Sequence, residues 1–427
     1  MRFLHPDPTI FAAASRRWIG RARASRLWAI GLFGFACGLP LPLSGFTLRY
    51  WLSESGVSLQ AIGLTASIGL AYTLKFLWAP LLDRVRPLPG LGRRRGWLLL
   101  IQPALALAAL GLALGDPGGH PGRIALIAML VAFLSASQDI VVDAWRIETY
   151  PPAAQGAALA AYVWGYRLAM LVAGAGVIGL AGPLGWHGAL AVVAGLIGLA
   201  MAVTLAVGEP VAAAPSGGGF RDGVVGPLRD LVARPGAGLI IGFVLLFKLG
   251  EALAQTMVAP FYRAMGFDRA AVALATGVPA LAAALLGAAA GGVLVARIGA
   301  ARALLITGFV QMASMGLYFL LAVSHGDGRI LLAKVVLEGF AEAMADAAFL
   351  SFLSGLCARR YTATQYALLS SLAALGLRTV AAGSGFVADT LGWLGFYGLA
   401  IFASVPAMLI MRVIIKRFPH AEPNLQI

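Results

Sequence analysis

Charged residues are scarce in this sequence. Only 12% of its 427 residues are Asp, Glu, Lys or Arg, whereas 60% are hydrophobic, and soluble globular domains carry about 25% charged residues. So little polar surface excludes most soluble folds, and it excludes a nucleic-acid partner as the meaning of the net charge of +14. A long apolar chain satisfies its backbone inside lipid by forming helices of about 20 residues. The composition therefore predicts an all-α polytopic protein of the lipid bilayer.

Residues that form disulfides or bind metals are also few. Cys37 and Cys357 lie far apart in apolar stretches, and the five histidines fall in predicted loops or tails. This spacing fits neither a disulfide framework nor a metal site. The sequence motifs of serine hydrolases, zinc proteases and phosphate-binding loops do not occur. We therefore expect no enzymatic activity, no metal and no cofactor.

Glycines recur at helical spacing within the apolar stretches. The stretch 174–179 has the letters of a dinucleotide-binding fingerprint, but it lies inside an apolar segment with no preceding strand. The pairs Gly34 and Gly38, and Gly287 and Gly291, have the spacing typical of close helix contacts. All of these glycines are interpreted as helix-packing positions.

Hydropathy divides the chain into twelve candidate spans. A window of about 20 residues places them at 27–48, 60–82, 97–115, 123–144, 156–182, 186–207, 237–261, 269–295, 300–322, 329–353, 364–390 and 393–414. The one long polar break is rich in proline and glycine. We therefore predict a six-helix half at 27–207, a cytoplasmic linker at 208–236, a second six-helix half at 237–415, and cytoplasmic tails at 1–26 and 416–427.

Basic residues are distributed unevenly over the predicted loops. Cytoplasmic loops of membrane proteins are enriched in Lys and Arg, and most of the 32 basic residues fall on one side. The predicted outer loops hold only Arg49, Arg123, Arg263, Arg269 and Arg329. Residues 1–26 contain no apolar run long enough for a signal peptide. Both termini are therefore predicted to be cytoplasmic. Four tryptophans near predicted helix ends are interpreted as interfacial anchors: Trp28, Trp51, Trp97 and Trp186.

The two predicted halves share landmarks. The fifth and eleventh segments each present a glutamine, a Gly-x-Arg triplet, a cluster of small residues and a Gly-Trp pair, in the same order. These landmarks include Gln155, Arg167 and Trp186 in the first half and Gln365, Arg378 and Trp393 in the second. Duplicated six-helix halves with a substrate path at their interface describe the major facilitator fold. We predict this fold.

Ionisable residues occur within the predicted spans, where they are costly and usually face a cavity or a partner. They include Lys75, Asp139, Arg167, Lys248, Glu251, Lys334, Glu338, Glu342, Asp346 and Arg378. The four from Lys334 to Asp346 recur every four residues and share one helix face. One interpretation is that the ion pairs Lys334–Glu338, Lys248–Glu251 and Asp143–Arg146 lock the structure. The other is that the set converges on one central cavity.

A cavity of mixed charge fits a small-molecule substrate that carries carboxylates and an amine. Arginine offers a two-pronged donor that matches a carboxylate and stays charged, which suits Arg167 and Arg378. A partly desolvated carboxylate beside a lysine changes its protonation as its surroundings change. Asp139, Glu251 and Glu338 are the candidates for such proton coupling. The sequence therefore predicts a carrier of a charged solute.

Several motifs resemble those of the AmpG-type muropeptide permeases, a major facilitator group that sits with peptide and acetyl-coenzyme A transporters. They are Gly38 to Leu41, Lys75 to Leu81, Ser135 to Ile140 with Asp143 to Trp145, Gly165 to Arg167, Lys248 to Glu251 and Thr362 to Ser371. The similarity runs from about residue 27 to 415. In one basic loop, Asp83, Arg84, Arg93, Arg94 and Arg95 resemble the cytoplasmic gate motif of major facilitators. Positive charge that merely orients the chain is the alternative explanation for this loop.

The resemblance implies a monomeric symporter that imports anhydro-muropeptides across the bacterial inner membrane, driven by protons through alternating access. It implies substrate binding by Lys75, Gln138, Arg167, Lys248, Gln365 and Arg378, and proton coupling by Asp139, Glu251 and Glu338. Glu342 is a further candidate for proton coupling, because it shares the charged helix face of Glu338. At Glu342 and Asp346 the family is expected to have small or hydroxyl residues. These acids favour a more cationic cargo or pair with Lys334. The alternatives are a symporter of an acyl-coenzyme A, a peptide or a siderophore-like solute, and a non-transporting membrane sensor.

Overall fold

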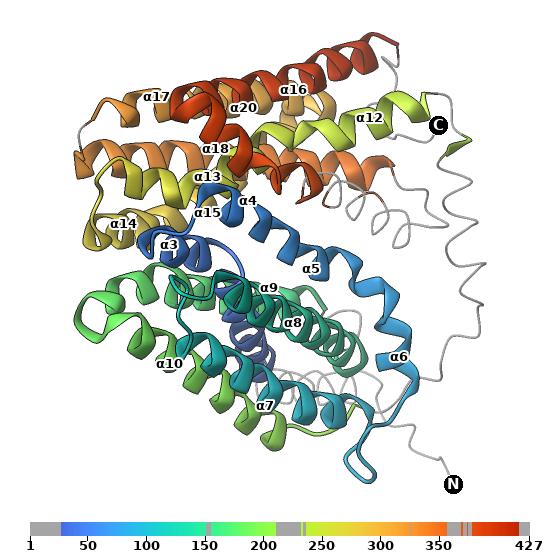
Figure 1. Ribbon diagram of the computed structural model, residues 1–427. Coiled ribbons are helices and arrows are strands. Elements are labelled where there is room, and N and C mark those ends of the chain that lie inside the picture. Colours follow the sequence, from blue (N-terminus) through green and yellow to red (C-terminus); the bar gives the residue numbers. More distant parts are fainter. Residues whose placement is uncertain are drawn as a thin grey trace, which may run out of the picture.

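The computed structural model describes residues 27–150, 155–210, 232–233, 236–324, 326–356, 369, 374 and 378–417. Helices make up almost all of this part of the chain, and none of it forms a β-strand. Figure 1 shows two bundles of helices, the first half of the chain in blue to green below and the second half in yellow to red above. The all-helical prediction is therefore confirmed.

The first half opens with the stretch Leu27–Glu54, which is long and apolar enough to span a membrane. Its helices include α2 (Pro40–Leu43) and α3 (Phe46–Glu54), and they are followed by a second, interrupted stretch. The elements of that stretch are α4 (Leu59–Leu64), η1 (Thr65–Gly69), α5 (Leu70–Leu74), η2 (Lys75–Leu77) and α6 (Ala79–Arg84). The remaining elements are α7 (Arg93–Ala113), α8 (Pro121–Thr149), α9 (Gln155–Leu171), η4 (Val172–Gly176) and α10 (Val177–Ala206).

The second half repeats this arrangement of long, partly interrupted helices. Its elements are α12 (Ala237–Phe247), α13 (Leu249–Ala264), α14 (Arg269–Thr276), α15 (Val278–Ile298), α16 (Ala300–Met315), α17 (Leu317–Ala322), α18 (Gly328–Leu356) and α20 (Ser384–Arg417). The long helix α18 carries the four charged residues that recur every four positions.

The predicted spans correspond well to the helices that are described. By length and apolar composition, eight helices in this part of the chain could cross a membrane. The predicted segment 364–390 lies largely outside the described residues, as do the tail 1–26 and most of the linker. The count of twelve, the side of the termini and the domain boundaries stay predictions.

Two glycines mark equivalent bends in the two halves. In α10 the backbone of Gly185 has φ 67° and ψ 171°, and in α20 the backbone of Gly392 has φ 66° and ψ 174°. A positive φ of this kind is easily adopted only by glycine. Each glycine precedes a tryptophan and separates two predicted spans. The Gly-Trp landmark noticed in the sequence therefore marks the same turn twice.

Close glycine contacts hold the helices together within each half. A Cβ added at Gly34 would lie 2.1 Å from the carbonyl oxygen of Tyr162, and one at Gly287 would lie 2.2 Å from that of Phe340. The packing interpretation is thereby confirmed for both glycine pairs. It is wrong for Gly174, because no atom lies within 4 Å of a Cβ added there and the residue lines a cavity.

The first spanning stretch is interrupted by proline and glycine. Proline lacks the N–H that a helix interior requires, and Pro40 and Pro42 lie in the short helix α2. The chain turns through Ser44 and Gly45 before α3 begins. Transporters commonly line their substrate path with such discontinuous helices. Here the break gives α3 its own start and directs its residues toward the interface between the halves.

Candidate functional site

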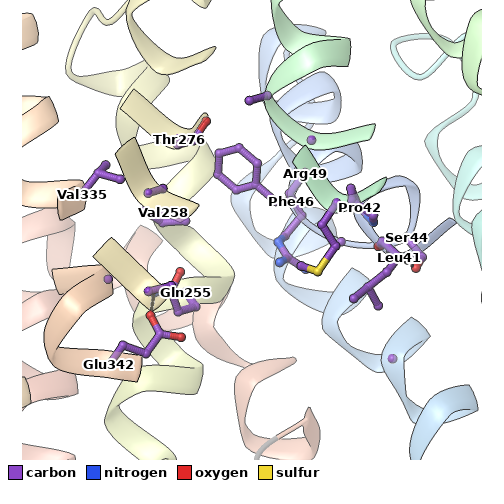
Figure 2. Close-up of a pocket in the computed structure, with 18 of the residues that line it drawn as sticks. Leu41, Pro42, Ser44, Phe46, Arg49, Gln255, Val258, Thr276, Val335 and Glu342 are labelled. Carbon is purple, nitrogen blue, oxygen red and sulfur yellow. Dashed lines mark hydrogen bonds between the residues drawn. The ribbon is translucent and has the colours of Figure 1, made fainter. Parts of the chain in front are cut away.

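A cavity of about 520 Å³ lies between the two halves. Its volume falls within the range of roughly 300–1,000 Å³ that is usual for small-molecule sites. Figure 2 shows Phe46 and Arg49 on the wall from the first half, with Gln255 and Glu342 on the opposite wall. The charged residues that line the cavity are Arg49, Arg167, Glu338, Glu342, Asp346 and Arg378.

The three cavity arginines have no ion-pair partner among the described residues. The Nε of Arg49 is buried and lacks a hydrogen-bond partner. Arg378 lies against Gly69 so closely that a Cβ added there would be 1.3 Å from its Nη1. Arg167 exposes more than a third of its surface and also lines the cavity. Three cations therefore face an open volume in which a ligand can supply the opposite charge.

Acidic residues of α18 form the other charged wall. Glu338, Glu342 and Asp346 all line the cavity, and Gln255 of α13 donates a hydrogen bond of 3.1 Å to Glu342 Oε2. The expectation that Glu342 or Asp346 pairs with Lys334 is wrong. Lys334 lies about two helical turns before Glu342 and about three before Asp346 in α18, and it pairs with the nearer carboxylate of Glu338.

Lys334 is the most completely buried cation in the described part of the chain, with 1% of its surface exposed. Its Nζ lies 2.5 Å from Glu338 Oε2 and donates a 3.0 Å hydrogen bond to the Tyr262 hydroxyl. The same ammonium lies 3.8 Å from the centre of the Tyr318 ring, which adds a cation–π interaction. The predicted Lys334–Glu338 pair is therefore present, with only Glu338 reaching the cavity.

Lys248 takes part in a second closed network. It forms ion pairs with Glu251, one turn along α13, and with Asp346 of α18. Gln311 of α16 also donates a hydrogen bond to Glu251. The predicted pairs Lys248–Glu251 and Asp143–Arg146 both form, the latter at 3.3 Å. Lys248 and Glu251 thus connect three helices beside the cavity, and the cavity lining does not include them.

Asp139 lies in the first half, within α8, and 7% of its surface is exposed. One of its carboxylate oxygens is buried without a hydrogen-bond partner, as is the side-chain oxygen of Gln138. Gln138 donates a weak hydrogen bond of 3.6 Å to the Cys37 sulfur, and the charge of Lys75 acts on Asp139. These residues form a polar group behind the cavity lining.

In the described ranges, no three metal-ligating side chains lie close enough together to hold a metal ion.

The predicted gate arginines gather around two acids that the sequence did not single out. Glu148 accepts ion pairs from Arg93 at 3.1 Å and from Arg94 at 2.6 Å. Glu209 accepts hydrogen bonds of 2.7 to 2.9 Å from the backbone N–H groups of Arg93, Arg94 and Arg95. A carboxylate at this position caps the start of α7 and complements its dipole. The three arginines and Glu148 belong to the first half, and Glu209 follows it at the start of the predicted linker.

The structure does not describe the side chains of three predicted site residues. Asp83 and Arg84 end α6, but their side chains lie outside the described part of the structure. Gln365 lies outside the described residues altogether. The structure therefore brings together Arg167, Arg378 and the α18 acids, and it sets Asp139 and Lys248 behind them.

At the end of the molecule away from the gate arginines, Glu54 of the first half contacts the second half. We call this the outer end, following the predicted orientation. Glu54 accepts hydrogen bonds of 3.0 Å from Arg269 Nε and 2.7 Å from the Trp186 indole, and Arg263 lies 3.7 Å away. The Trp51 and Trp186 rings are buried and stack at 5.9 Å. Their interpretation as interfacial anchors is therefore wrong, because both complete the core around Glu54.

The same end brings the two halves into backbone contact. A Cβ added at Gly385 of α20 would lie 1.9 Å from the carbonyl oxygen of Leu59, and Gln60 donates a 2.6 Å hydrogen bond to Asp389. Together with the Glu54 contacts, this packing joins the two halves at the outer end. Arg49, Glu54, Glu148 and Glu209 are the functional candidates that sequence reasoning missed. Arg49 had been assigned to an outer loop, and it lies within α3.

Curated relatives of the chain include transporters. The anhydromuropeptide permease of Escherichia coli (strain K12) is 38% identical over 395 residues, which cover 92% of this chain and 80% of that protein. A protein of Rickettsia conorii, named as transporter AmpG 4, is 33% identical over 396 residues, covering 90% of this chain and 95% of the relative. No family model matches the chain.

Solved structures share its fold at low sequence identity. A bacterial homologue of the human lysosomal transporter Spinster, in an inward-facing and occupied conformation, matches with a TM-score of 0.71 and 14% identity, over 93% of this chain and 98% of that one. The nucleoside transporter NupG matches with a TM-score of 0.72 and 14% identity, over 91% and 99%. Both have the major facilitator fold, and the fold prediction is confirmed.

Proposed function

The chain belongs to the family of AmpG-type anhydromuropeptide permeases, and from this premise we propose that it is a proton-coupled symporter of anhydro-muropeptides. As a member of that family it is a transporter of a small molecule, not an enzyme. Its apolar helices make it a multi-pass protein of the bacterial inner membrane. The substrate, the coupling ion and the residue roles are the proposal.

The observation that carries the proposal is the opposition of charge across the cavity. Anhydro-muropeptides bear several carboxylates and an amino group. Arg167 and Arg378 are free to bind carboxylates, while Glu342 on the facing wall suits the amino group. Gln138, Lys75, Lys248 and Gln365 complete the proposed substrate set. Of these, Lys248 acts through Asp346, which it holds in the cavity wall.

Proton coupling is proposed for Asp139, Glu251, Glu338 and Glu342. A coupling carboxylate must change its protonation as the cavity opens to one side and then the other, which requires a partly desolvated site with a nearby cation. Glu251 and Glu338 each contact a lysine, and Asp139 is buried with one unpartnered oxygen. Because such groups titrate together, we assign coupling to the set rather than to one member.

Alternating access would proceed by rocking the two six-helix halves about the cavity. In this scheme the contacts of Glu54 hold the outer end closed while substrate leaves at the inner end. The gate cluster, Asp83, Arg84 and Arg93 to Arg95 with their acids, would then govern the inner end. Monomeric function, the linker at 208–236 and cytoplasmic termini are parts of the same proposal.

Uptake into membrane vesicles tests the proposal. We expect radiolabelled anhydro-muropeptide to accumulate when a proton gradient is imposed, and accumulation to stop when the gradient is collapsed. Arg167→Ala should lower the affinity for substrate roughly 10- to 100-fold. If uptake survives both changes, neither the coupling nor the binding proposal stands. Preferential uptake of an acyl-coenzyme A, peptide or siderophore-like solute would keep the fold and replace the cargo.

A further inference from the structure

Arg49 is a cavity residue to which no function has yet been given. The break at Ser44 and Gly45 starts α3 at Phe46, and one turn later Arg49 reaches the cavity wall. Figure 2 shows this side chain beside Phe46, on the wall that faces Gln255 and Glu342. Its Nε is buried without a hydrogen-bond partner. Arg49 as a whole is half-buried, and leaving its buried guanidinium nitrogen without a partner is costly, so its place in the wall indicates a ligand.

Arg378 approaches the same region from the other half. Its guanidinium lies against Gly69 of η1, and its charge acts on Arg49. In the parts of the chain that are described, no carboxylate pairs with either arginine. Two unpaired like charges that line the same cavity repel each other in a region of low dielectric. An anion between them would remove the repulsion and satisfy both sets of donors.

The lysines near the cavity are paired, whereas among the described residues the cavity arginines are not. A general excess of positive charge therefore does not explain why the arginines lack partners. Lys248 and Lys334 lie behind the other wall, outside the cavity lining, and each is paired with a carboxylate. Lysine charge is thus neutralised by the protein, and arginine charge is left for the ligand. Arginine is also the better carboxylate receptor, because its planar fork donates two parallel hydrogen bonds.

We propose that Arg49 and Arg378 together bind one carboxylate of the transported solute and so link the two halves around it. The inference rests on the proposed function, since it takes the solute to be an anhydro-muropeptide. Arg49 belongs to the first half and Arg378 to the second. A carboxylate held by both is therefore bound fully only when the halves are in the arrangement that brings these residues together. Arg167 remains available for a second carboxylate of the same solute.

Binding to purified protein in lipid nanodiscs provides the test. The probes are a radiolabelled anhydro-muropeptide and the same compound with its carboxylates converted to carboxamides. Arg49→Gln is expected to weaken binding of the acid roughly 10- to 100-fold and to leave binding of the carboxamide nearly unchanged. A merely structural arginine would affect the two probes alike, so the difference between them is the decisive readout.

Two further variants separate charge from position. Arg49→Lys keeps the charge without the fork, so it should bind the acid with intermediate affinity. Gly69→Ala keeps both arginines but places a Cβ where the Arg378 guanidinium lies, so it should also weaken the acid selectively. The matched control is Arg123→Gln in α8, an exposed arginine outside the cavity, for which both affinities should stay at the wild-type value.

The outcomes are distinguishable. If the wild type binds the acid and Arg49→Gln changes neither probe, or changes both equally, this inference is overturned while the proposed function stands. If the wild type binds no anhydro-muropeptide, the proposed function fails and this inference fails with it. Should Arg49→Gln not fold, as judged by size-exclusion chromatography, Arg49→Lys and Gly69→Ala decide by the same comparison.

Discussion

Around the cavity, the described residues of the first half leave Arg49, Arg167 and Asp139 without an ion pair, whereas those of the second half pair both lysines, Lys248 and Lys334, with carboxylates. Arg49 and Asp139 each have a buried side-chain atom without a hydrogen-bond partner. Lys248 and Lys334 are both paired with carboxylates. Since both halves contain the same glycine bend before a tryptophan, the difference lies in the side chains and not in the architecture. Paired charges hold helices together here, and single charges are available to a ligand or a proton.

Breaking the most buried pair should have the largest effect. Lys334→Met removes the partner of Glu338 at a site where 1% of the lysine is exposed. An uncompensated buried charge costs about 3–5 kcal/mol of folding free energy. We expect a correspondingly lower unfolding free energy, measured by tryptophan fluorescence during unfolding in mixed micelles.

The double variant Lys334→Met with Glu338→Gln is the control for this prediction. Because both charges are then absent, most of the lost stability should return. If the single variant is as stable as the wild type, the second half does not depend on its ion pairs. The two halves would then differ in where their charges lie, and not in how much those charges contribute to the free energy of unfolding.

The Glu54 cluster sharpens the comparison, because here a charge of the first half is paired across the interface. Glu54→Gln weakens the contacts with Arg269 and Arg263, which are partly exposed. A loss of about 1–2 kcal/mol would shift the balance roughly 5- to 30-fold toward an open outer end. Distances between spin labels at positions 123 and 329 should show a larger open population. Asp116→Asn, which affects only hydrogen bonds within its own loop, should leave the distances unchanged.

Asp139 should give the smallest change in stability. Its unpartnered carboxylate oxygen makes no bond that Asp139→Asn would remove, so we expect the unfolding free energy to change by less than about 1 kcal/mol. Proton-driven uptake should nevertheless be lost, because an amide cannot bind and release the proton. Facilitated exchange of labelled for unlabelled substrate, which needs no net proton movement, should persist. If Asp139→Asn strongly lowers the free energy of unfolding, Asp139 contributes to stability as the paired charges do, and this prediction fails.

Much of the fold follows from patterns within single segments. Apolar length predicted an all-helical protein with several membrane spans, and glycine spacing predicted the close contacts of Gly34 and Gly287; the structure confirms both. The pairs Lys334–Glu338 and Lys248–Glu251 were also readable from the sequence. Residues three or four apart on a helix lie on one face at a fixed rise. Predicting such pairs therefore requires no knowledge of which helices are neighbours.

Errors arose where the helix boundary or the partner helix mattered. Arg49 was placed in a loop because the window ended its helix at residue 48, whereas the break at Gly45 starts a new helix that continues to Glu54. Trp186 was interpreted as an anchor because it lies next to a predicted end. In the structure its indole donates to Glu54 of another segment. Hydropathy measures the affinity of a segment for lipid, and it carries no information on the direction of a side chain at its ends.

The sequence by itself determined an all-helical membrane protein with two similar halves, a transporter family, and ion pairs within single helices. Only the tertiary structure decided which charges meet across helices: Lys248 with Asp346, Gln255 with Glu342, and Glu209 with the start of α7. It also decided that the cavity arginines have no described partner while the lysines have one. The physical reason is that spacing along one helix is fixed by its backbone geometry. Contacts between helices depend on their depth, rotation and crossing, which are set by the packing of the whole bundle.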